Sequence, residues 1–344
     1  MSKLSSKIAK ISVAAVAVVG LSVSALNADT LENTKKQGFV KCGVNSEVPG
    51  FAEVVNGGVY KGLDVDGCRA VAAAVLGDAS KVKYVPLNAK ERFTALQSGE
   101  IDVLVRNTTW TETRDTSLGL NFAGINYYDG QGFMVNKALG VKSAKELDGA
   151  SICVQTGTTT ELNVADYFRA NNMKYKIVSY DANDQVVKAY ESGRCDVLTS
   201  DASQLYALRT KFKNPNAHMV LPEIISKEPL GPVVRQGDDK WFNIVKWSFF
   251  AMVAAEENGI TSKNVDKLKN SSTNPAVKRI LGVEGKMGEN LGLSKDFAYQ
   301  IIKQVGNYGE VFERNVGINT PLKMKRGINA LWTKGGLQYS PPFR

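Results

Sequence analysis

The sequence predicts an α/β protein built from two similar lobes, and three observations lead to this fold class. Apolar runs rich in β-branched residues alternate with helical patterns through the middle of the chain. This order occurs twice, and LQSGEIDVL at 96–104 and YESGRCDVL at 190–198 share the pattern S-G-x-x-D-V-L. The length of 344 residues suits about two domains. Each lobe is therefore expected to hold a mainly parallel sheet flanked by helices.

The N-terminal segment, residues 1–28, has the pattern of a secretory signal peptide. Three lysines precede the apolar run 11–26, and small residues near its end predict cleavage near Ala25 or Ala28. The alternative is a single transmembrane anchor, but the run is shorter and less apolar than the roughly 20 residues that a membrane span needs. Cleavage would lower the formal net charge from +9 to +6, because it removes three lysines and no acids. Basic and acidic residues are interspersed, so no nucleic-acid partner is expected.

The first lobe is expected to follow a β-α-β-α-β order. Strands separated by helices in this way are typical of a parallel sheet. The predicted elements are a strand at 39–45, an Ala-rich helix within 62–77, a strand at 82–87, a helix at 90–100 and a strand at 101–105.

The second lobe is expected to repeat this order. Its predicted elements are a strand at 150–157, a helix at 160–172, a strand at 175–180, a helix at 184–194 and a strand at 195–201. An extended stretch with two glycines, 127–136, suits a hinge between the lobes. The predicted boundaries are 29–128 with 229–344 for lobe 1, which includes a C-terminal helical extension, and 129–228 for lobe 2 with the hinge strands. Two crossing strands would leave a cleft, where ligands usually bind.

The four cysteines predict structural disulfides, since a secreted protein meets an oxidising compartment. Three pairings are possible. Local pairing joins Cys42 to Cys68 and Cys153 to Cys195, which places one bridge in each lobe. The spacings do not suit a zinc site, so no metal is expected.

Polar residues follow the two D-V-L strands at equivalent positions. Asn107, Thr109 and Arg114 follow the first strand, and Asp201 follows the second. Ligands sit beyond the carboxyl ends of the strands in an open parallel sheet. A guanidinium from one lobe and a carboxylate from the other would suit a zwitterion that carries a carboxylate and an ammonium. The alternatives are a surface ion pair for Arg114 and a helix N-cap for Asp201.

The segment QTGTTTE at 155–161 adds to this hypothesis. Its glycine and threonines, Thr158 and Thr159 among them, lie between a predicted strand and a predicted helix. Free N–H groups and hydroxyls at such a turn can hold a carboxylate, and the alternative is a plain helix cap.

Signals of catalysis are weak, and no cofactor is expected. The single histidine, His218, lies in a loop-like segment, and the chain has no nucleophile elbow or P-loop. The competing function is a dehydratase-like enzyme acting on a small carboxylic acid, which would need an acid–base residue in the cleft. Its loose candidates are Glu47, Glu53 and Glu161. A sensor input domain, the third class, would need a following transmembrane segment and signalling domain.

The sequence resembles the periplasmic polar-amino-acid-binding proteins that supply ABC importers. GLDVDGCRAVAAAV at 62–75 is similar to the family signature after the first strand, although Gly67 replaces a larger apolar residue. TETR at 111–114 is similar to the family's T-E-x-R. The resemblance implies a type II periplasmic binding protein fold with a two-strand hinge. It also implies an L-amino-acid ligand, an inner-membrane ABC permease as partner, action as a monomer and no enzymatic activity.

The resemblance also implies a role for each matching residue. Arg114 would bind the α-carboxylate of the ligand, and Asp201 would hold its α-amino group. Thr109 and Thr159 would contact the carboxylate, and Asn107 would supply a backbone contact. Thr158 belongs to the turn that precedes Thr159.

Three further features are similar to the general L-amino-acid-binding subfamily: the run 85–104, the closing stretch 326–344 and the cysteine placement. Val48 stands where basic-amino-acid binders often have an aromatic residue, so Phe51 is the candidate for apolar contact with the ligand. Arg92 and Arg106 are candidates to meet an acidic or amide side chain.

Overall fold

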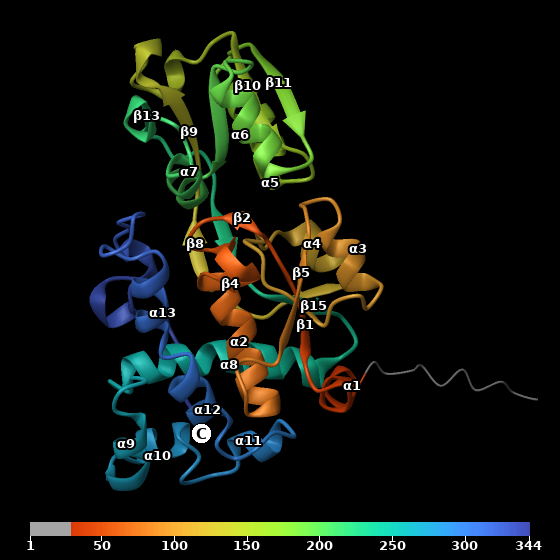
Figure 1. Ribbon diagram of the computed structural model, residues 1–344, viewed down its shortest axis with the longest axis vertical. Coiled ribbons are helices and arrows are strands. Elements are labelled where there is room, and N and C mark those ends of the chain that lie inside the picture. Colours follow the sequence, from red (N-terminus) through yellow and green to blue (C-terminus); the bar gives the residue numbers. More distant parts are fainter. Residues whose placement is uncertain (1–28) are drawn as a thin grey trace, which may run out of the picture.

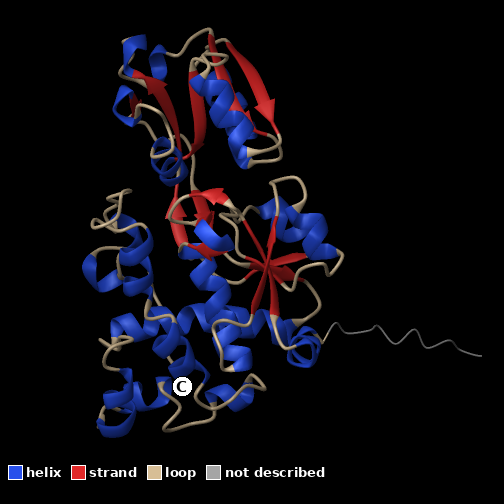
Figure 2. Ribbon diagram, in the orientation of Figure 1, coloured by secondary structure: helices blue, strands red, loops and turns tan. Residues whose placement is uncertain are grey.

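The computed structural model describes residues 29–344, so the predicted signal peptide lies outside the described residues. The chain forms two α/β bodies, one above the other in Figure 1, and helices flank the strands in both (Figure 2). The predicted α/β fold class with two lobes is confirmed by these two separate five-stranded sheets.

Lobe 1 contains the sheet with strand order β5-β1-β6-β15-β7. β1 pairs in parallel with β5 and β6, as the β-α-β-α-β order predicted. β15 runs antiparallel to β6 and β7, because the chain returns to lobe 1 after it has built lobe 2. The strands are β1 (Val40–Val44), β5 (Val82–Pro86), β6 (Val103–Leu104), β7 (Leu120–Phe122) and β15 (Val233–Arg235), and the helices are α1 (Thr30–Gln37), α2 (Leu63–Leu76), α3 (Arg92–Gln97) and α4 (Glu112–Ser117).

Lobe 2 has the equivalent order β11-β10-β12-β9-β13. β10 pairs in parallel with β11 and β12, and β9 runs antiparallel to β12 and β13. The two D-V-L segments therefore occupy matching central strands, β6 and β12. The strands are β9 (Gln131–Asn136), β10 (Ala150–Gln155), β11 (Tyr175–Tyr180), β12 (Val197–Asp201) and β13 (His218–Val220), and the helices are α5 (Thr159–Ala170), α6 (Asn183–Glu191) and α7 (Ala202–Arg209).

The hinge consists of two antiparallel strands, β8 (Tyr127–Asp129) and β14 (Glu228–Leu230), which pair Asp129 with Glu228. The predicted two-strand crossing is confirmed, and β8 lies between the two bodies in Figure 1. A small antiparallel sheet follows β1 and consists of β2 (Glu47–Val48), β3 (Ala52–Val55) and β4 (Val59–Lys61).

The C-terminal segment is mostly helical and shares one core with lobe 1. α8 (Asp239–Glu257) packs against α2, and the buried Trp241 donates its indole N–H to the carbonyl of Asp102 at 2.9 Å. No helix between residues 29 and 344 is both long enough and apolar enough to span a membrane. The remaining helices are α9 (Val265–Ser271), α10 (Pro275–Ile280), α11 (Met287–Asn290), α12 (Phe297–Gln304) and α13 (Tyr308–Asn315).

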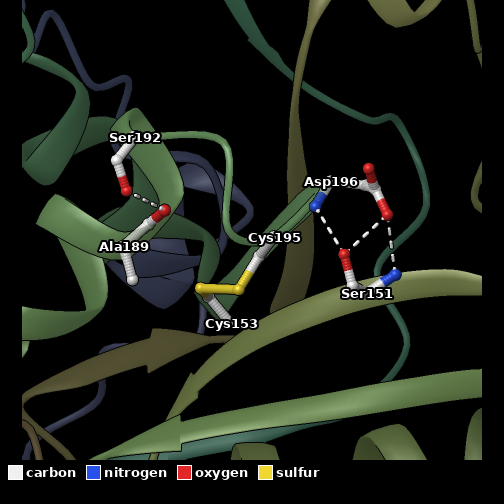
Figure 3. Close-up of a disulfide and its surroundings, with 6 residues drawn as sticks. All are labelled: Ser151, Cys153, Ala189, Ser192, Cys195 and Asp196. Carbon is white, nitrogen blue, oxygen red and sulfur yellow. Dashed lines mark hydrogen bonds between the residues drawn. A yellow bond between two sulfur atoms is a disulfide. The ribbon is translucent and has the colours of Figure 1, made fainter.

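Both predicted disulfides form, and each connects an inner strand of its sheet, β1 or β10, to a neighbouring element. Cys42 of β1 bonds Cys68 of α2, and Cys153 of β10 bonds Cys195, which precedes β12. Beside the second bridge, Ser151 donates its backbone N–H and its hydroxyl to the carboxylate of Asp196 at 2.8 and 2.6 Å (Figure 3). These bonds set the start of β12 in register with β10.

Candidate functional site

The ends of β6 and β12 meet at the hinge, and the loop after β6 is held by contacts to both lobes. Asn107 has a φ of +26°, and its backbone N–H donates to the carboxylate of Asp64 at 3.0 Å. Its side-chain amide donates to Gln204 of α7 in lobe 2 at 2.9 Å. Burial raises the pKa of Asp64 to about 6. The loop after β6 is thus hydrogen-bonded to an acid of α2 in lobe 1 and to a side chain of α7 in lobe 2.

Arg114 lies in the first turn of α4 and points inward rather than to the surface. Its guanidinium is buried, donates to the carbonyl of Thr109 at 2.9 Å and lies 5.2 Å from the ring centre of Phe93. Burial lowers the pKa of Arg114, and the negative charges of Glu228 and Asp201 oppose that shift. Among residues 29–344 no carboxylate forms an ion pair with Arg114 within 4.0 Å, so the alternative of a surface ion pair does not hold.

Two further buried arginines, Arg92 and Arg106, lie near Arg114. Arg92 lies 4.8 Å from the same Phe93 ring and donates to the Thr108 hydroxyl at 3.3 Å, while its Nε has no partner among the described residues. Burial and the neighbouring arginines lower the pKa of Arg92. Arg106 donates its Nε–H to the carbonyl of Leu87 at 2.7 Å, and burial lowers its pKa to about 10. The lobe 1 side of the site is therefore strongly cationic.

The opposite side is anionic. Asp201, at the end of β12, is 5% exposed. It occupies the N-cap position of α7, as the alternative expected, but its side chain makes no cap hydrogen bond there. Burial raises the pKa of Asp201, and the nearby Asp129 and Glu228 raise it further. Asp129 ends the hinge strand β8, and burial raises its pKa to about 7 against hydrogen bonds from Ser203 and Gly130. An ammonium in this position would relieve the repulsion between these carboxylates.

Thr109 and Thr159 come from different lobes and both bind the hinge residue Glu228. Their hydroxyls donate to Glu228 Oε2 at 2.6 and 2.9 Å and lie 3.4 Å from each other. The sequence suggested these two threonines but not Glu228 or Asp129. Both acids lie in the segments predicted to cross between the lobes, and an acid inside such an otherwise apolar crossing was the signal that could have revealed them.

Thr158 and Phe51 have structural contacts. Thr158 caps α5, because its hydroxyl accepts from the Glu161 N–H at 3.3 Å and donates to the carbonyl of Gln155 at 2.7 Å. Phe51 is 2% exposed and packs edge-on against Tyr127, with ring centres 5.2 Å apart. His218 is buried in lobe 2, and its Nδ1 lies 2.8 Å from the hydroxyl of Tyr190.

A small cavity of about 130 Å³ adjoins Arg106 and takes its walls from both lobes. Glu47 lines it beside Arg106, and Gln155 and Ala182 close it from lobe 2. The other two acid–base candidates are engaged elsewhere. Glu53 pairs with Lys61 at 3.5 Å, and Glu161 accepts the N–H of Gly157 at 3.3 Å.

Comparison with known proteins places this geometry in a family. The family model described as "Bacterial extracellular solute-binding proteins, family 3" matches residues 40–263. The chain belongs to this family. The type II periplasmic binding protein fold expected from the sequence is thereby confirmed, as is the resemblance to the amino-acid-binding members.

Three similar proteins match almost the whole length of this chain. The general L-amino acid-binding periplasmic protein AapJ of Rhizobium johnstonii is 62% identical over 95% of this chain and 96% of its own length. The glutamate/glutamine/aspartate/asparagine-binding protein BztA of Rhodobacter capsulatus is 57% identical over 96% and 97%. A solved ABC transporter/periplasmic binding protein from Brucella ovis with glutathione bound is 60% identical and has a TM-score of 0.90, covering 92% of this chain and 100% of that one.

Proposed function

We propose that the protein captures L-amino acids between its two lobes in the periplasm and delivers them to an inner-membrane ABC permease. One observation carries the proposal: a buried arginine from lobe 1 and a buried aspartate from lobe 2 lie near the hinge, and neither has an ion-pair partner among the described residues. Arg114 is 8% exposed and Asp201 is 5% exposed, and among residues 29–344 neither forms an ion pair within 4.0 Å. Leaving both charges buried without a partner is costly, and a zwitterionic ligand would satisfy both.

In this proposal Arg114 binds the α-carboxylate of the ligand and Asp201 holds its α-ammonium. Asn107, Thr109, Thr158 and Thr159 frame the ligand from the turns that follow β6 and β10. The contact between Asn107 and Gln204 supports closure of the two lobes over the ligand. Only the closed state brings both charges to the ligand, so binding shifts the protein toward closure.

Arg92 and Arg106 favour ligands with an acidic or amide side chain. Arg92 is 2% exposed and retains an unpaired Nε, which leaves a buried guanidinium with donors free for a ligand. The relatives support this preference, because BztA is named for glutamate, glutamine, aspartate and asparagine. Glutathione, bound in the Brucella ovis structure, is also compatible, since its γ-glutamyl end keeps a free α-carboxylate and α-ammonium.

We further propose that the protein is no enzyme, that it acts as a monomer and that a signal peptide is removed near Ala25 or Ala28. Support for a binding role comes from the solute-binding family and from the contacts that already engage Glu53 and Glu161.

A thermal-shift panel on the protein without residues 1–28 tests the function. The ligands are the twenty L-amino acids, D-glutamate, glutathione and carboxylic acids that lack an amine. Ligands that bind the folded state raise the melting temperature. L-Glutamate and L-glutamine should give the largest shifts and the amine-free acids little or none. A shift with a keto or hydroxy acid and none with any amino acid would contradict the proposal.

The side-chain role of the arginines is tested on the same panel. Arg92→Ala and Arg106→Ala should weaken L-glutamate binding by ~10-fold or more, because each removes a charge-assisted hydrogen bond, and should affect L-alanine much less. Arg169→Ala removes an exposed arginine that pairs with Asp166 and serves as the control. Unchanged L-glutamate affinity in both variants would show that neither arginine meets the ligand side chain.

A further inference from the structure

We propose that the C-terminal stretch, residues 321–344, docks the protein on the surface of a membrane that contains anionic lipids. The proposal goes beyond the amino-acid site, because none of the site residues described above belongs to this stretch. The surface concerned, called here the C-terminal surface, consists of four exposed apolar residues and four exposed bases: Ile328, Trp332, Leu337 and Tyr339, and Lys323, Lys325, Lys334 and Arg344.

Large apolar side chains gather on the C-terminal surface. Among residues 29–344, thirteen large hydrophobic side chains are exposed, and four of them lie within residues 328–339. Each of the four is more than half exposed, at 52% for Ile328, 54% for Trp332, 52% for Leu337 and 57% for Tyr339. Single exposed apolar residues are ordinary on a protein surface, whereas a group of them marks an interaction site.

The backbone brings these four apolar side chains together. Leu337 and Tyr339 flank the buried Gln338, so both point outward from the same side of the chain. The rings of Trp332 and Tyr339 meet edge to face with their centres 5.7 Å apart. The N–H of Leu337 donates to the carbonyl of Ile328 at 2.8 Å. The four residues therefore form one patch.

The same stretch is basic. Residues 321–344 contain five Lys and Arg residues and no Asp or Glu. Arg326 pairs with Glu256 at 3.1 Å. The other four bases are exposed, and among residues 29–344 none of them has a carboxylate within 4.0 Å. Their positive charges are thus open to an anionic partner.

Two acids of α8 lie beneath the C-terminal surface, and both are engaged from within the protein. Glu256 accepts two hydrogen bonds from the Arg326 guanidinium, each at 3.1 Å. Glu257 accepts the indole N–H of Trp332 at 3.1 Å and the N–H of Ser340 at 3.2 Å, and burial raises the pKa of Glu257. Neither acid forms an ion pair with the exposed bases.

A groove of about 360 Å³ adjoins the aromatic pair and carries two guanidinium groups. Trp332 and Tyr339 line it together with Arg279 and Arg344. Arg279 donates its Nε–H to the carbonyl of Phe343 at 2.8 Å, which leaves its terminal N–H groups for an anion. Arginine suits a phosphate group because it can bond two of the oxygens at once.

A lipid surface accounts for both properties of this face, the apolar patch and the positive charge. Trp and Tyr favour the boundary between membrane and water, and Lys and Arg near a membrane are attracted to anionic headgroups. A soluble anion would engage the bases and leave the four apolar side chains in water.

The position of the C-terminal surface is compatible with ligand capture. The C-terminal segment shares one core with lobe 1, and the chain ends at the end of the molecule opposite lobe 2 (Figure 1). Docking through this segment would therefore leave lobe 2 free to open and close.

Co-sedimentation with lipid vesicles tests the proposal on the protein without residues 1–28. One set of vesicles contains phosphatidylglycerol and phosphatidylcholine in equal parts, and the other contains phosphatidylcholine alone. The wild type should bind the anionic vesicles, and added salt should weaken this binding, because salt screens exposed charges. Binding to the neutral vesicles should be much weaker.

Two double variants separate charge from apolar contact. Lys325→Glu/Lys334→Glu should lower binding to the anionic vesicles by ~10-fold or more, since each base near such a surface contributes about fivefold. Trp332→Ser/Leu337→Ser should lower it several-fold, because it removes apolar area that leaves water on docking. Both variants should keep the wild-type affinity for L-glutamate, which also shows that they fold.

Matched controls come from lobe 2. Lys142→Glu changes an exposed lysine without an ion pair, and Leu162→Ser changes an apolar side chain that is 68% exposed. Neither should alter vesicle binding. If a surface variant does not fold, quenching of wild-type tryptophan fluorescence by brominated phosphatidylglycerol replaces it. Trp332→Phe should remove this quenching, and Trp110→Phe should leave it.

A wild type that binds anionic and neutral vesicles equally, or binds neither, would overturn the proposal. So would self-association in sedimentation velocity that Trp332→Ser/Leu337→Ser abolishes, or retention only by vesicles that contain membrane proteins, since the partner would then be a protein. Failure of the wild type to bind any amino acid would contradict the proposed function and would leave the vesicle result unaffected.

Discussion

Around the hinge, three buried arginines lie near two buried acids and one half-buried acid, and at the scale of single residues this opposition of charges is the main feature of the molecule. Buried charges are unfavourable unless they are paired, so a site of this kind is arranged for a ligand with matching charges. The groups are Arg92, Arg106 and Arg114 on one side and Asp129, Asp201 and Glu228 on the other.

Replacing Asp201 tests the ammonium contact. Asp201→Asn keeps the shape of the side chain and removes its charge, so we expect a loss of roughly 2–5 kcal/mol of binding free energy for L-amino acids. Isothermal titration calorimetry measures it. Asp196→Asn, before the start of the same strand, removes a carboxylate that bonds Ser151 and should leave the affinity unchanged. Wild-type affinity in Asp201→Asn would refute the ammonium assignment.

At the scale of elements, the disulfides connect β1 to α2 in lobe 1 and β10 to the segment that precedes β12 in lobe 2. The bridges close segments of 26 and 42 residues, and loops of this length predict a contribution of about 3–4 kcal/mol each to the free energy of unfolding. The Cys153→Ser/Cys195→Ser double variant should therefore unfold at a lower denaturant concentration, as measured by circular dichroism in guanidinium chloride. Its ratio of L-glutamate to L-alanine affinity should stay constant, because the bridge lies away from the site residues. A changed ratio would indicate that this bridge shapes the site.

The hinge is the element that assembles the site. β8 contributes Asp129 and β14 contributes Glu228, and these two residues pair directly across the strands. On the other edge of β8, Asn329 accepts the N–H of Tyr128 at 2.7 Å and donates to its carbonyl at 2.9 Å. The C-terminal segment therefore completes the hydrogen bonding of the hinge strand and holds it on lobe 1.

At the scale of the whole molecule, two acids with raised pKa values link the stability of the fold to pH. Burial raises the pKa of Asp129 to about 7, and burial together with Asp129 raises the pKa of Asp201. A folded pKa above the unfolded value means that the folded state binds more protons. The contribution of these two acids to the free energy of unfolding of the ligand-free protein should therefore decrease as pH rises from about 4 to about 7. Asp129→Asn should reduce this slope in denaturant titrations across that range. An unchanged slope in Asp129→Asn would contradict this prediction.

The same linkage applies to ligand binding. Below about pH 7 the Asp129–Asp201 pair keeps a proton, and an incoming ammonium favours the ionised form. Binding at pH 6 should therefore release a proton, which calorimetry detects as a dependence of the heat on the ionisation enthalpy of the buffer. The release should become smaller as the pH rises above the pKa values of these two acids.

Local patterns in the sequence were enough to predict the two-lobe α/β order, the matching D-V-L strands, both disulfides and the family. The lobe order and the matching strands depend on hydrophobic period, helix termination and short-range repetition, which act over a few residues. The disulfides were predicted from the secretory context and local pairing, and the family from a resemblance of motifs. The same patterns pointed to Arg114 and Asp201, because the carboxyl ends of strands in such sheets are where ligands bind.

The antiparallel return of β15, the burial of Arg92 beside Arg114, and the meeting of Glu228 with Thr109 were decided by the tertiary structure. Thr109 and Glu228 are 119 residues apart, and no local pattern relates them. Their contact exists because two hinge strands cross between the lobes side by side. The sequence could therefore suggest the threonines, whereas only the folded structure placed both of them against Glu228.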